Sequence, residues 1–389
     1  GTARRAKELA ESFVKNGHTV NVLTSTPRAF RSFPDYEFKL LEVFNNVNIY
    51  RVNTFFEVNR NVFFRILSYA SFFIRSLRKA IKLSHKSDII ISIAPLSSGL
   101  IGAVCQKVTK KHHHFDVPDM LPDLGIAAGM LKNKLLISFL YKVEKWVYNN
   151  SSTISGCTKG HVKAIKNKNI TTKDIYWIPD WIDENFFNTN AEIFISEVKK
   201  KYNFNDKKLI SFVGNIGALQ KPDVFIEVMR LMQEEGYDEL LFLFIGDGIM
   251  LRDLKFLVKK YHLNNVKFVG KVKREYVPSL MKISTVLVTN YVPNKHLDLY
   301  IPGKLFEYAI SKKPIIMGSN GDAKDFINKF KLGIAVPPSN INKFKESILA
   351  VANDSFKFNP DIKSFISLYS ISHVTSLYNN IFNKIKFDD

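Results

Sequence analysis

The sequence predicts an α/β protein built from two Rossmann-like domains that face one another across a cleft. Short runs rich in Ile, Leu and Val alternate with amphipathic segments of about 10 to 15 residues, which is typical of parallel sheets built from βαβ units. The alternation breaks at 179–183 and then resumes, and 389 residues are enough for two domains. Open α/β sheets bind ligands at the carboxyl ends of their strands, so the cleft is the expected active site.

The first half opens with a helix. Apolar residues recur at helical spacing over 3–16 and end at a typical C-cap, Gly17. The isoleucine-rich run at 87–93 indicates a strand buried on both faces. Sheets of this kind usually begin with a strand, so we expect a first strand and its glycine-rich turn upstream of Gly1. The alternative is a family variant that lacks this strand. The other elements expected here are strands at 19–24, 47–52, 112–117 and 175–178, and helices at 59–84, 97–109, 131–148 and 159–166.

The second half repeats the alternation with shorter connections. The break near residue 180 predicts a first domain over 1–180 and a second over 181–370. A C-terminal helix at 371–389 is expected to pack back on the first domain. The elements expected in this half are strands at 209–213, 240–245, 266–269, 285–289 and 314–317, and helices at 223–234, 251–261, 274–282, 303–311 and 322–329.

The chain is strongly basic. Lysine and arginine number 56 against 36 acidic residues, a formal charge of +20, and most of the excess lies in residues 1–180. This predicts a polyanionic partner, which can be nucleic acid, an anionic membrane face or a phosphorylated ligand. Two cysteines without CxxC spacing exclude a disulfide framework and a cysteine-type zinc site. No run of 18 apolar residues is present, so no transmembrane helix is predicted.

The most informative motif runs from Ile301 to Ala309, with Pro302 and Gly303 at the start of a predicted helix. Backbone N–H groups are free at such a start, and with the helix dipole they favour a phosphate. Glu307 falls one turn inside the helix, where it can accept hydrogen bonds from a ribose diol. The competing interpretation is an ordinary helix start with a solvent-facing glutamate.

A second motif at 212–221 joins a predicted strand to a predicted helix and contains Gly214 and Gly217. Such a turn lets the backbone approach a diphosphate while polar side chains contact its oxygens. The polar residues of the turn are Asn215, Gln220 and Lys221. A plain strand-to-helix turn is the alternative, and the Gly-Asp-Gly turn at 246–248 is weaker still. Neither GxGxxG nor a P-loop sequence is present, which disfavours dinucleotide dehydrogenases and P-loop NTPases.

In this order the motifs resemble those of the family 4 retaining glycosyltransferases, which have the GT-B fold. The nucleotide-binding half of that family is similar to Phe-Val-Gly-Asn-Ile-Gly, Ile-Gly-Asp-Gly, Phe-Val-Gly-Lys and Pro-Gly-Lys-Leu-Phe-Glu-Tyr at 212–217, 245–248, 268–271 and 302–308. Residues 116–123 resemble a first-domain segment of members that build bacterial surface polysaccharides. Residues 1–5 resemble the end of the family's glycine-rich first turn. The pattern is most similar to fucosaminyl-transferase-like members from O-antigen and capsule clusters.

The resemblance implies a nucleotide-sugar donor in the second domain and an acceptor in the first. Glu307 would bind the ribose, N–H groups near Gly303 the diphosphate, and the turn at Gly270–Val272 the base. The donor-binding residues implied are Gly214, Asn215, Gly217, Gln220, Lys221, Gly246, Gly270, Val272, Pro302, Gly303, Lys304, Leu305 and Glu307. Protein groups would carry the diphosphate charge, so neither a metal nor a cofactor is expected.

The resemblance also implies two catalytic residues, Asp119 in the first domain and Asp298 in the second. Asp119 would face the donor sugar. Asp298 lies beside Leu299, which stands where the family often carries a second glutamate, and it would substitute for that group. Pro118 stands where many relatives have arginine, so a phosphate or carboxylate contact expected there is in doubt.

The helix predicted over 59–84 is the candidate acceptor or membrane surface. Its cations are interleaved with aromatic residues and it contains no acid, which suits an interfacial helix on anionic lipid. A core helix whose cations face water is the alternative. The residues assigned to the acceptor or the membrane are Gly1, Thr2, Arg65, Arg75, Arg78, Lys79 and Lys82.

These features predict a metal-independent, retaining glycosyltransferase of the hexosyltransferase type. It would move an N-acetylated hexosamine from a UDP-linked donor to a lipid-linked or oligosaccharide acceptor in bacterial surface polysaccharide synthesis. We expect it in the cytoplasm, peripheral on the inner face of the cell membrane, with no nucleic-acid partner. Two alternatives stay open: a nucleotide-sugar 2-epimerase of the GT-B fold, and a basic nucleic-acid-binding protein, although no recognised motif supports the latter.

Overall fold

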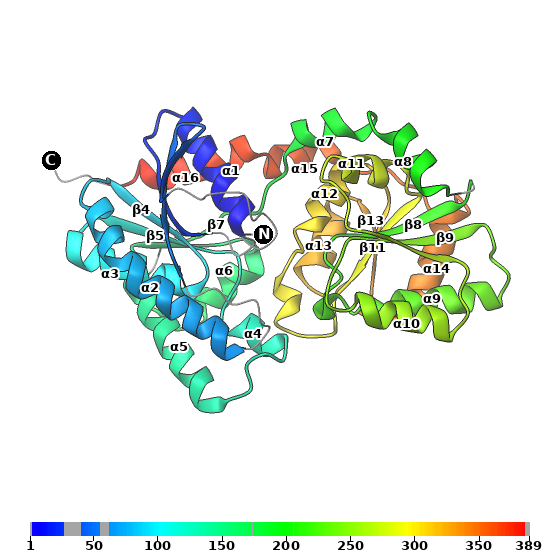
Figure 1. Ribbon diagram of the computed structural model, residues 1–389, viewed down its shortest axis with the longest axis horizontal. Coiled ribbons are helices and arrows are strands. Elements are labelled where there is room, and N and C mark those ends of the chain that lie inside the picture. The colour runs from blue at the N-terminus through cyan, green and yellow to red at the C-terminus, as the bar shows by residue number, and fades with distance from the viewer. Residues whose placement is uncertain (1, 27–39, 55–61, 173, 205, 386–389) are drawn as a thin grey trace. The chain divides into compact units, whose positions relative to one another are not determined.

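The computed structural model describes residues 2–26, 40–54, 62–172, 174–204 and 206–385. The chain divides into two compact units (Figure 1). Unit 1 comprises Gly1–Asp180 and Ile371–Asp389, and unit 2 comprises Trp181–Ser370. Within the described ranges, no helix is both long and apolar enough to cross a bilayer.

Unit 1 contains two sheets. In the first, with the order β1–β3–β2, β1 runs parallel and β2 antiparallel to β3. The second is fully parallel, with the order β4–β5–β6–β7. Among the described strands, none pairs with the second edge of β1 or of β4. The strands are β1 (Asn21–Ser25), β2 (Leu41–Phe44), β3 (Val47–Val52), β4 (Ile89–Ile93), β5 (His112–Val117), β6 (Thr153–Gly156) and β7 (Ile175–Trp177).

The strand β3 was predicted from sequence, but β2, which pairs with it in a hairpin, was not. The turn of this hairpin consists of Asn45 and Asn46, with φ angles of 50° and 62°. Positive φ at both positions is what a two-residue type I′ turn requires, and asparagine tolerates this region better than most residues. Three of the four β2 residues are exposed, so the strand lacks the regular alternation of buried and exposed residues that reveals a strand in sequence.

Two helices far apart in sequence lie side by side in unit 1 (Figure 1). The rings of Phe13 on α1 and Tyr378 on α16 meet edge to face, with their centroids 5.6 Å apart. Leu23 of β1 and Ile90 of β4 both pack against one cluster formed largely by α2 and α3. The helices of the unit are α1 (Thr2–Lys15), α2 (Val62–Ser84), α3 (Leu96–Thr109), α4 (Asp123–Ala127), α5 (Lys134–Asn149), α6 (Lys159–Lys166) and α16 (Ile371–Phe382).

Unit 2 contains one six-stranded, fully parallel sheet with the order β10–β9–β8–β11–β12–β13. Numbered along the unit, this is the 3-2-1-4-5-6 order of doubly wound folds, and the connections reverse direction between β8 and β11. Ligands of such sheets bind at that switch point. The strands are β8 (Lys208–Val213), β9 (Leu240–Ile245), β10 (Val266–Gly270), β11 (Val286–Asn290), β12 (Ile315–Gly318) and β13 (Gly333–Val336).

A phenylalanine-rich core supports one face of this sheet. Phe212 and Phe244 on the strands pack with Phe225 of α9 and Phe344 of α14 in one buried cluster, which α10 joins through Leu254. The helices of the unit are α7 (Glu184–Ala191), α8 (Ile195–Tyr202), α9 (Asp223–Glu234), α10 (Leu251–Lys260), α11 (Tyr276–Ile283), α12 (Lys304–Ile310), α13 (Asp322–Lys329), α14 (Ile341–Ala352) and α15 (Ile362–Tyr369), with 3₁₀ turns η2 (Ala218–Gln220) and η3 (Leu297–Leu299).

Candidate functional site

Three glycine turns follow β8, β9 and β10 and stack on one another at the carboxyl edge of the unit 2 sheet. A Cβ atom on Gly246 would lie 2.0 Å from the carbonyl oxygen of Gly214, and one on Gly248 would lie 2.2 Å from that of Ile216. Gly246 also has a φ of +137°, and its N–H donates to the carbonyl oxygen of Gly270 at 2.9 Å. These glycines are therefore needed for the turns to pack, before any role in binding.

Tyr308 fastens α12 to the end of β8. Its hydroxyl accepts from the N–H of Val213 at 2.7 Å and donates to the carbonyl oxygen of the same residue at 3.0 Å. The side chain is fully buried, and burial raises its pKa well above the ordinary value, so it stays a neutral donor. The first turn of α12, with Gly303 and Lys304, is thereby held beside the turn after β8.

Lys304 points into this junction. Its Nζ atom is shielded from solvent, has no hydrogen-bond partner, and lies 3.7 Å from the centroid of the Phe212 ring. It is also 3.5 Å from where a Cβ on Gly214 would stand, so the glycine leaves room for it. Burial lowers the pKa of Lys304 to about 7, while Glu307 opposes that shift. A nearby anion would complete this arrangement electrostatically.

The polar residues of the β8 turn surround Gly217. A Cβ at Gly217 would lie 2.7 Å from both Asn215 Nδ2 and Gln220 Oε1, so these two side chains lie close to it. Gln220 Oε1 is buried and has no hydrogen-bond partner, whereas Asn215 is exposed. Lys221 follows in the left-handed region with a φ of 41° and is half-buried. Asn215, Gln220 and Lys221 thus all lie on the connection from β8 to α9, and Nζ of Lys304 lies next to its first residue, Gly214.

A buried asparagine that sequence reasoning missed joins the loops around the switch point. Asn290 Nδ2, at the end of β11, donates to the carbonyl oxygen of Gln220 at 3.1 Å and lies 3.2 Å from Ser339 Oγ. Its Oδ1 accepts from the Ser339 N–H at 2.9 Å. A Cβ on Gly318 would lie 2.1 Å from that Oδ1, so a glycine is needed at position 318 to leave room for the fully buried Asn290 side chain. An asparagine directly after an apolar strand is the signal that was available.

The remaining predicted donor residues lie at the same carboxyl edge or on α12. Val272 is half-buried two residues after β10. Pro302 and Leu305 are buried, and Glu307 is half-buried one turn into α12. Asp298 lies in η3, and burial raises the pKa of its carboxyl group.

In unit 1, the end of β5 carries a buried ion cluster. Arg5 of α1 donates to Asp116 from Nε at 2.7 Å and from Nη2 at 3.2 Å, and to Asp180 from Nη1 at 2.6 Å. Arg5 is 5% exposed and Asp116 is fully buried. Burial alone would raise the pKa of Asp116, but Arg5 holds it below the ordinary value. Sequence reasoning missed this cluster, whose ion pairs hold α1 against the carboxyl edge of the β4–β5–β6–β7 sheet.

The predicted catalytic residue Asp119 lies two residues beyond β5 and is half-buried. Its pKa is raised, first by burial and then by the negative charge of Asp180, while Arg5 opposes both effects. The carboxyl ends of parallel strands are where α/β sheets carry functional groups. Asp119 is therefore a carboxyl group with a perturbed pKa in the expected position within its own unit.

The described residues contain no group of three or more His, Cys, Asp and Glu side chains placed to hold a metal ion. His113 and His114 are buried, and burial lowers their pKa values to about 3 and about 4. His113 Nε2 lies 3.0 Å from Ser92 Oγ, and both nitrogens of His114 bond to hydroxyl groups of β6. These histidines are neutral packing residues.

The cations of α2 whose side chains the structure describes, Arg75, Arg78, Lys79 and Lys82, are exposed. Arg75 donates to the carbonyl oxygen of Asn53 at 3.1 Å, and Lys79 lies over the Tyr50 ring. Exposed apolar side chains accompany them, namely Phe64, Leu67 and Ile74. The predicted acceptor or membrane set also contains Gly1, Thr2 and Arg65. The structure does not describe Gly1 or the side chains of Thr2 and Arg65.

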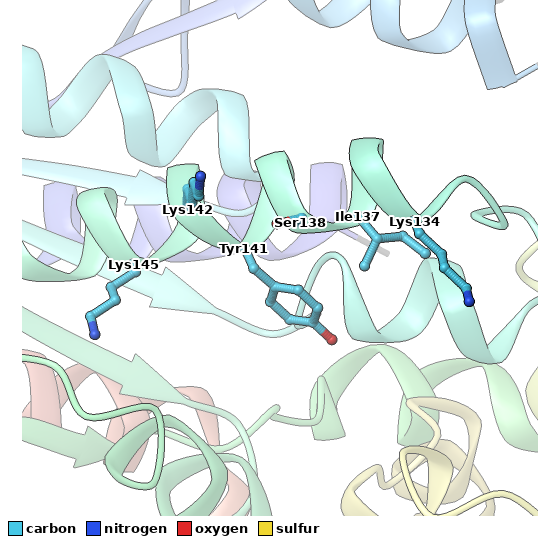
Figure 2. Close-up of a pocket in the computed structure, with 6 residues that line it drawn as sticks. All are labelled: Lys134, Ile137, Ser138, Tyr141, Lys142 and Lys145. Atoms are coloured by element: carbon cyan, nitrogen blue, oxygen red, sulfur yellow. The ribbon is translucent and has the colours of Figure 1, made fainter.

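A surface pocket lies along α5, and Figure 2 shows its side chains along successive turns of that helix. The lining residues are Lys134, Ile137, Ser138, Tyr141, Lys142 and Lys145. Tyr141 donates from its hydroxyl to Asp123 at 2.6 Å. On the same helix Leu135 is 83% exposed and Phe139 is 60% exposed. None of the candidate site residues predicted from sequence lines this pocket, which is a basic and apolar surface of unit 1.

The six-stranded sheet of unit 2 has the strand order of doubly wound α/β proteins, with stacked glycine turns and a buried lysine at the edge where such sheets bind ligands. Residues 1–186 match the family described as "Glycosyltransferase Family 4", and residues 194–364 match the family described as "Glycosyl transferases group 1". Together the two matches account for nearly all of the chain. The chain belongs to the family 4 glycosyltransferases, with a group 1 second half.

Individual proteins agree with this assignment. The alpha-D-kanosaminyltransferase of Streptomyces kanamyceticus is 23% identical over 172 residues, which are 44% of this chain and 43% of that protein. The match thus spans less than half of that relative's length.

Solved structures show the fold. The Anabaena protein Alr3699/HepE, solved with UDP and glucose, has a TM-score of 0.72 at 11% identity, over 97% of this chain and 94% of that one. The sucrose-phosphate synthase of Thermosynechococcus elongatus has a TM-score of 0.78 at 15% identity, over 99% and 93%. The predicted fold class, an α/β GT-B-like fold with parallel sheets, is confirmed.

Proposed function

We propose that this chain transfers a sugar from a UDP-linked donor to a lipid-linked or oligosaccharide acceptor. The observation that carries the proposal is the ammonium group of Lys304, which is shielded from solvent and lacks a hydrogen-bond partner beside the Gly214 turn. A buried cation without a partner is costly unless an anion completes it. The diphosphate of a nucleotide sugar is such an anion, and the Anabaena fold neighbour was solved with UDP.

In this proposal each part of the donor has its own residues. Lys304, the N–H groups near Gly303 and the polar side chains of the β8 turn hold the diphosphate. Glu307 accepts hydrogen bonds from the ribose, and the turn at Gly270–Val272 contacts the base. As the bond to the sugar breaks, negative charge grows on the diphosphate, and fixed cations and N–H donors stabilise it. The protein's own groups thus perform the charge stabilisation, and we propose transfer without a bound metal.

Asp119 and Asp298 are proposed to act in the transfer step. Both carboxyl groups have raised pKa values because of burial, and such groups are poised to exchange protons or to hold sugar hydroxyls. We propose a retaining reaction in which the acceptor attacks from the side of the leaving group. An N-acetylated hexosamine, of the kind moved by fucosaminyl-transferase-like enzymes of O-antigen and capsule synthesis, is the proposed sugar.

Binding of nucleotides tests the donor assignment. Isothermal titration calorimetry with UDP, UDP-N-acetylglucosamine, GDP and GDP-mannose is expected to give at least tenfold tighter binding for the two uridine ligands, a difference of about 1.4 kcal/mol. The physical reason is that the base turn distinguishes the nucleotides while the diphosphate contacts are shared. The absence of nucleotide binding at millimolar concentration would overturn the proposed function.

The same preparation tests the reaction with an Asp119→Asn variant. We expect its UDP affinity to stay within about twofold of wild type, while sugar transfer to polyprenyl-diphosphate-linked acceptors falls about 100-fold, in the range for loss of one acid or base group. Mass spectrometry of the products separates the alternatives. An epimerised nucleotide sugar formed without acceptor indicates a 2-epimerase, and wild-type transfer by the variant removes Asp119 from the site.

We further propose that unit 1 binds an anionic membrane peripherally, at the inner face of the cell membrane, where a lipid-linked acceptor would lie. Two helices support this, because each combines exposed cations with exposed apolar side chains. On α2, Arg78 and Lys82 accompany Ile74, which is 72% exposed. On α5, Lys142 and Leu135 are both exposed and lie seven residues apart, so they share one side of the helix about two turns from each other. This composition is that of interfacial helices on acidic lipid.

Liposome flotation tests this surface. A variant with glutamine at four of the α2 cations, Arg75, Arg78, Lys79 and Lys82, is expected to bind phosphatidylglycerol vesicles at least tenfold more weakly, since each basic residue near such a surface contributes about 1 kcal/mol. The matched control replaces four exposed cations of α10 in unit 2, Arg252, Lys255, Lys259 and Lys260, and should bind like wild type. Equal losses in both variants would show that only net charge matters and would reject the α2 surface.

A further inference from the structure

We infer that binding of the donor diphosphate places a proton on Lys304, so that this residue couples the occupancy of the donor site to pH. The inference rests on the proposed function and states how that same site is regulated. It begins from the geometry of Lys304. Tyr308 fixes α12 to Val213, and the shielded Nζ of Lys304 lies 3.5 Å from where a Cβ on Gly214 would stand, with no hydrogen-bond partner.

The surroundings of Lys304 disfavour a charged amine in the absence of ligand. The Phe212 ring lies 3.7 Å from Nζ, and because its face attracts an ammonium group it partly opposes the effect of burial; neither Phe212 nor Gly214 can titrate. Burial lowers the pKa of Lys304 to about 7, and Glu307 on the same helix is the charged group that opposes this. Tyr308 stays neutral because burial raises its pKa. The other charged residues of the turns after β8 and β9 are Lys221 and Asp247.

A diphosphate reverses this preference. Its charges beside Nζ favour the ammonium form, so the pKa of Lys304 rises on binding and a proton moves from the buffer to the amine nitrogen. At pH 8 the free protein is mostly in the amine form, because its pKa is about 7, and binding takes up about one proton. Below about pH 6 both forms are protonated and uptake disappears. Above pH 7 the affinity falls by up to about tenfold per pH unit.

Calorimetry with UDP as the probe measures this uptake. UDP is titrated into the full chain at pH 8 and pH 9 in pairs of buffers that differ in ionisation enthalpy, where the phosphate group of UDP, with a pKa of about 6, no longer titrates. We expect the observed heat to change with the buffer by the equivalent of about one proton per site. A Lys304→Arg variant, whose side chain cannot lose its proton, should show no such dependence. Lys304→Met should lose binding by at least tenfold.

A second measurement needs no ligand. The unfolded chain keeps its lysine protonated up to about pH 10, whereas folded Lys304 loses its proton near pH 7. Between these values the unfolded state binds more protons, so the stability of wild type relative to Lys304→Met rises with pH, by up to about tenfold in the folding constant per unit. Below about pH 6 Lys304 is protonated in both the folded and the unfolded state, and the difference in stability is constant. Urea unfolding measures it, and Lys324→Met, at an exposed position of α13, serves as the control.

The outcomes separate the inference from the function on which it rests. UDP binding without proton uptake, together with a flat pH difference between wild type and Lys304→Met, overturns the inference and leaves the donor assignment standing. A failure of wild type to bind UDP overturns both. Proton uptake that persists in Lys304→Arg assigns the titration to another group and also rejects the inference.

Discussion

Replacing Arg5 with methionine is expected to lower the free energy of unfolding by about 3–5 kcal/mol, the largest effect on stability that we predict from a single substitution. Arg5 is 5% exposed and makes charged hydrogen bonds to Asp116 and Asp180. Methionine leaves the fully buried carboxylate of Asp116 without its partner, and a buried, unpaired charge is the costly outcome. Chemical denaturation followed by circular dichroism measures the loss.

Two controls show whether the charge is responsible. Arg230 also forms two ion pairs, with Glu227 and Glu234, but on the surface of α9, so Arg230→Met should cost far less. Adding Asp116→Asn to Arg5→Met should restore part of the lost stability, because the unpaired charge is removed. If the double variant is less stable than the single one, the loss comes from packing rather than from charge.

The pH dependence of the Arg5 effect has a definite sign. Arg5 lowers the pKa of Asp116, so the stabilisation is complete above the unfolded value of 3.8 and is lost as the pH falls through the lower folded value. In Arg5→Met the guanidinium group no longer lowers the pKa of Asp116, so the effect of burial, which raises this pKa, is no longer opposed by Arg5. The difference in free energy of unfolding between the two proteins should therefore narrow as the pH falls toward 3.8.

Replacing Glu307 with alanine is expected to weaken UDP binding by about 10- to 100-fold. A hydrogen bond to a charged group contributes about 1.5–3 kcal/mol, and the expected loss corresponds to about one such bond from Glu307 to the ribose diol. The residue is half-buried on α12, one turn from Gly303, so alanine removes the carboxylate from a helix whose position Tyr308 maintains. Isothermal titration calorimetry with UDP measures the change.

Inorganic pyrophosphate is the discriminating ligand for this prediction. It has no ribose, so Glu307→Ala should not weaken its binding. Glu346→Ala is the matched control, since this glutamate is 57% exposed on α14 and belongs to none of the proposed contacts. Equal losses for UDP and pyrophosphate would mean that Glu307 acts on the diphosphate region, and unchanged UDP affinity would remove the ribose role.

Much of unit 2 could be predicted because its signals are local. The predicted strands and helices there lie within about two residues of the observed ones, since each apolar run is short and bounded by turn residues. Glycines placed directly after strands marked the turns, and the structure shows that Gly246 and Gly248 leave no room for a Cβ. What spacing could not show is that these turns stack, because stacking depends on the order of strands in the sheet.

Both units contain elements that sequence reasoning missed: β2, β6 and α4 in unit 1, and α7, α8, β13, α14 and α15 in unit 2. Two features of unit 1 show why. The β2–β3 hairpin depends on an Asn45-Asn46 turn beside a mostly exposed strand, so neither apolar alternation nor a glycine revealed it. The Arg5 cluster joins residues 111 and 175 positions apart, and nothing in the local sequence pairs them. Folding alone brings these charges together.

The sequence by itself determined the α/β class, the places of the turns and the motif around Glu307, because periodicity and turn chemistry act over a few residues. The tertiary structure decided which charged side chains are buried. Lys304 and Arg5 are both cations near helix starts in the sequence. In the structure Arg5 binds two carboxylates, whereas Nζ of Lys304 has no hydrogen-bond partner. Burial of a side chain depends on every residue that packs around it. The buried Nζ of Lys304 without a hydrogen-bond partner, which is the strongest indication of an anion site, could therefore be seen only in the folded chain.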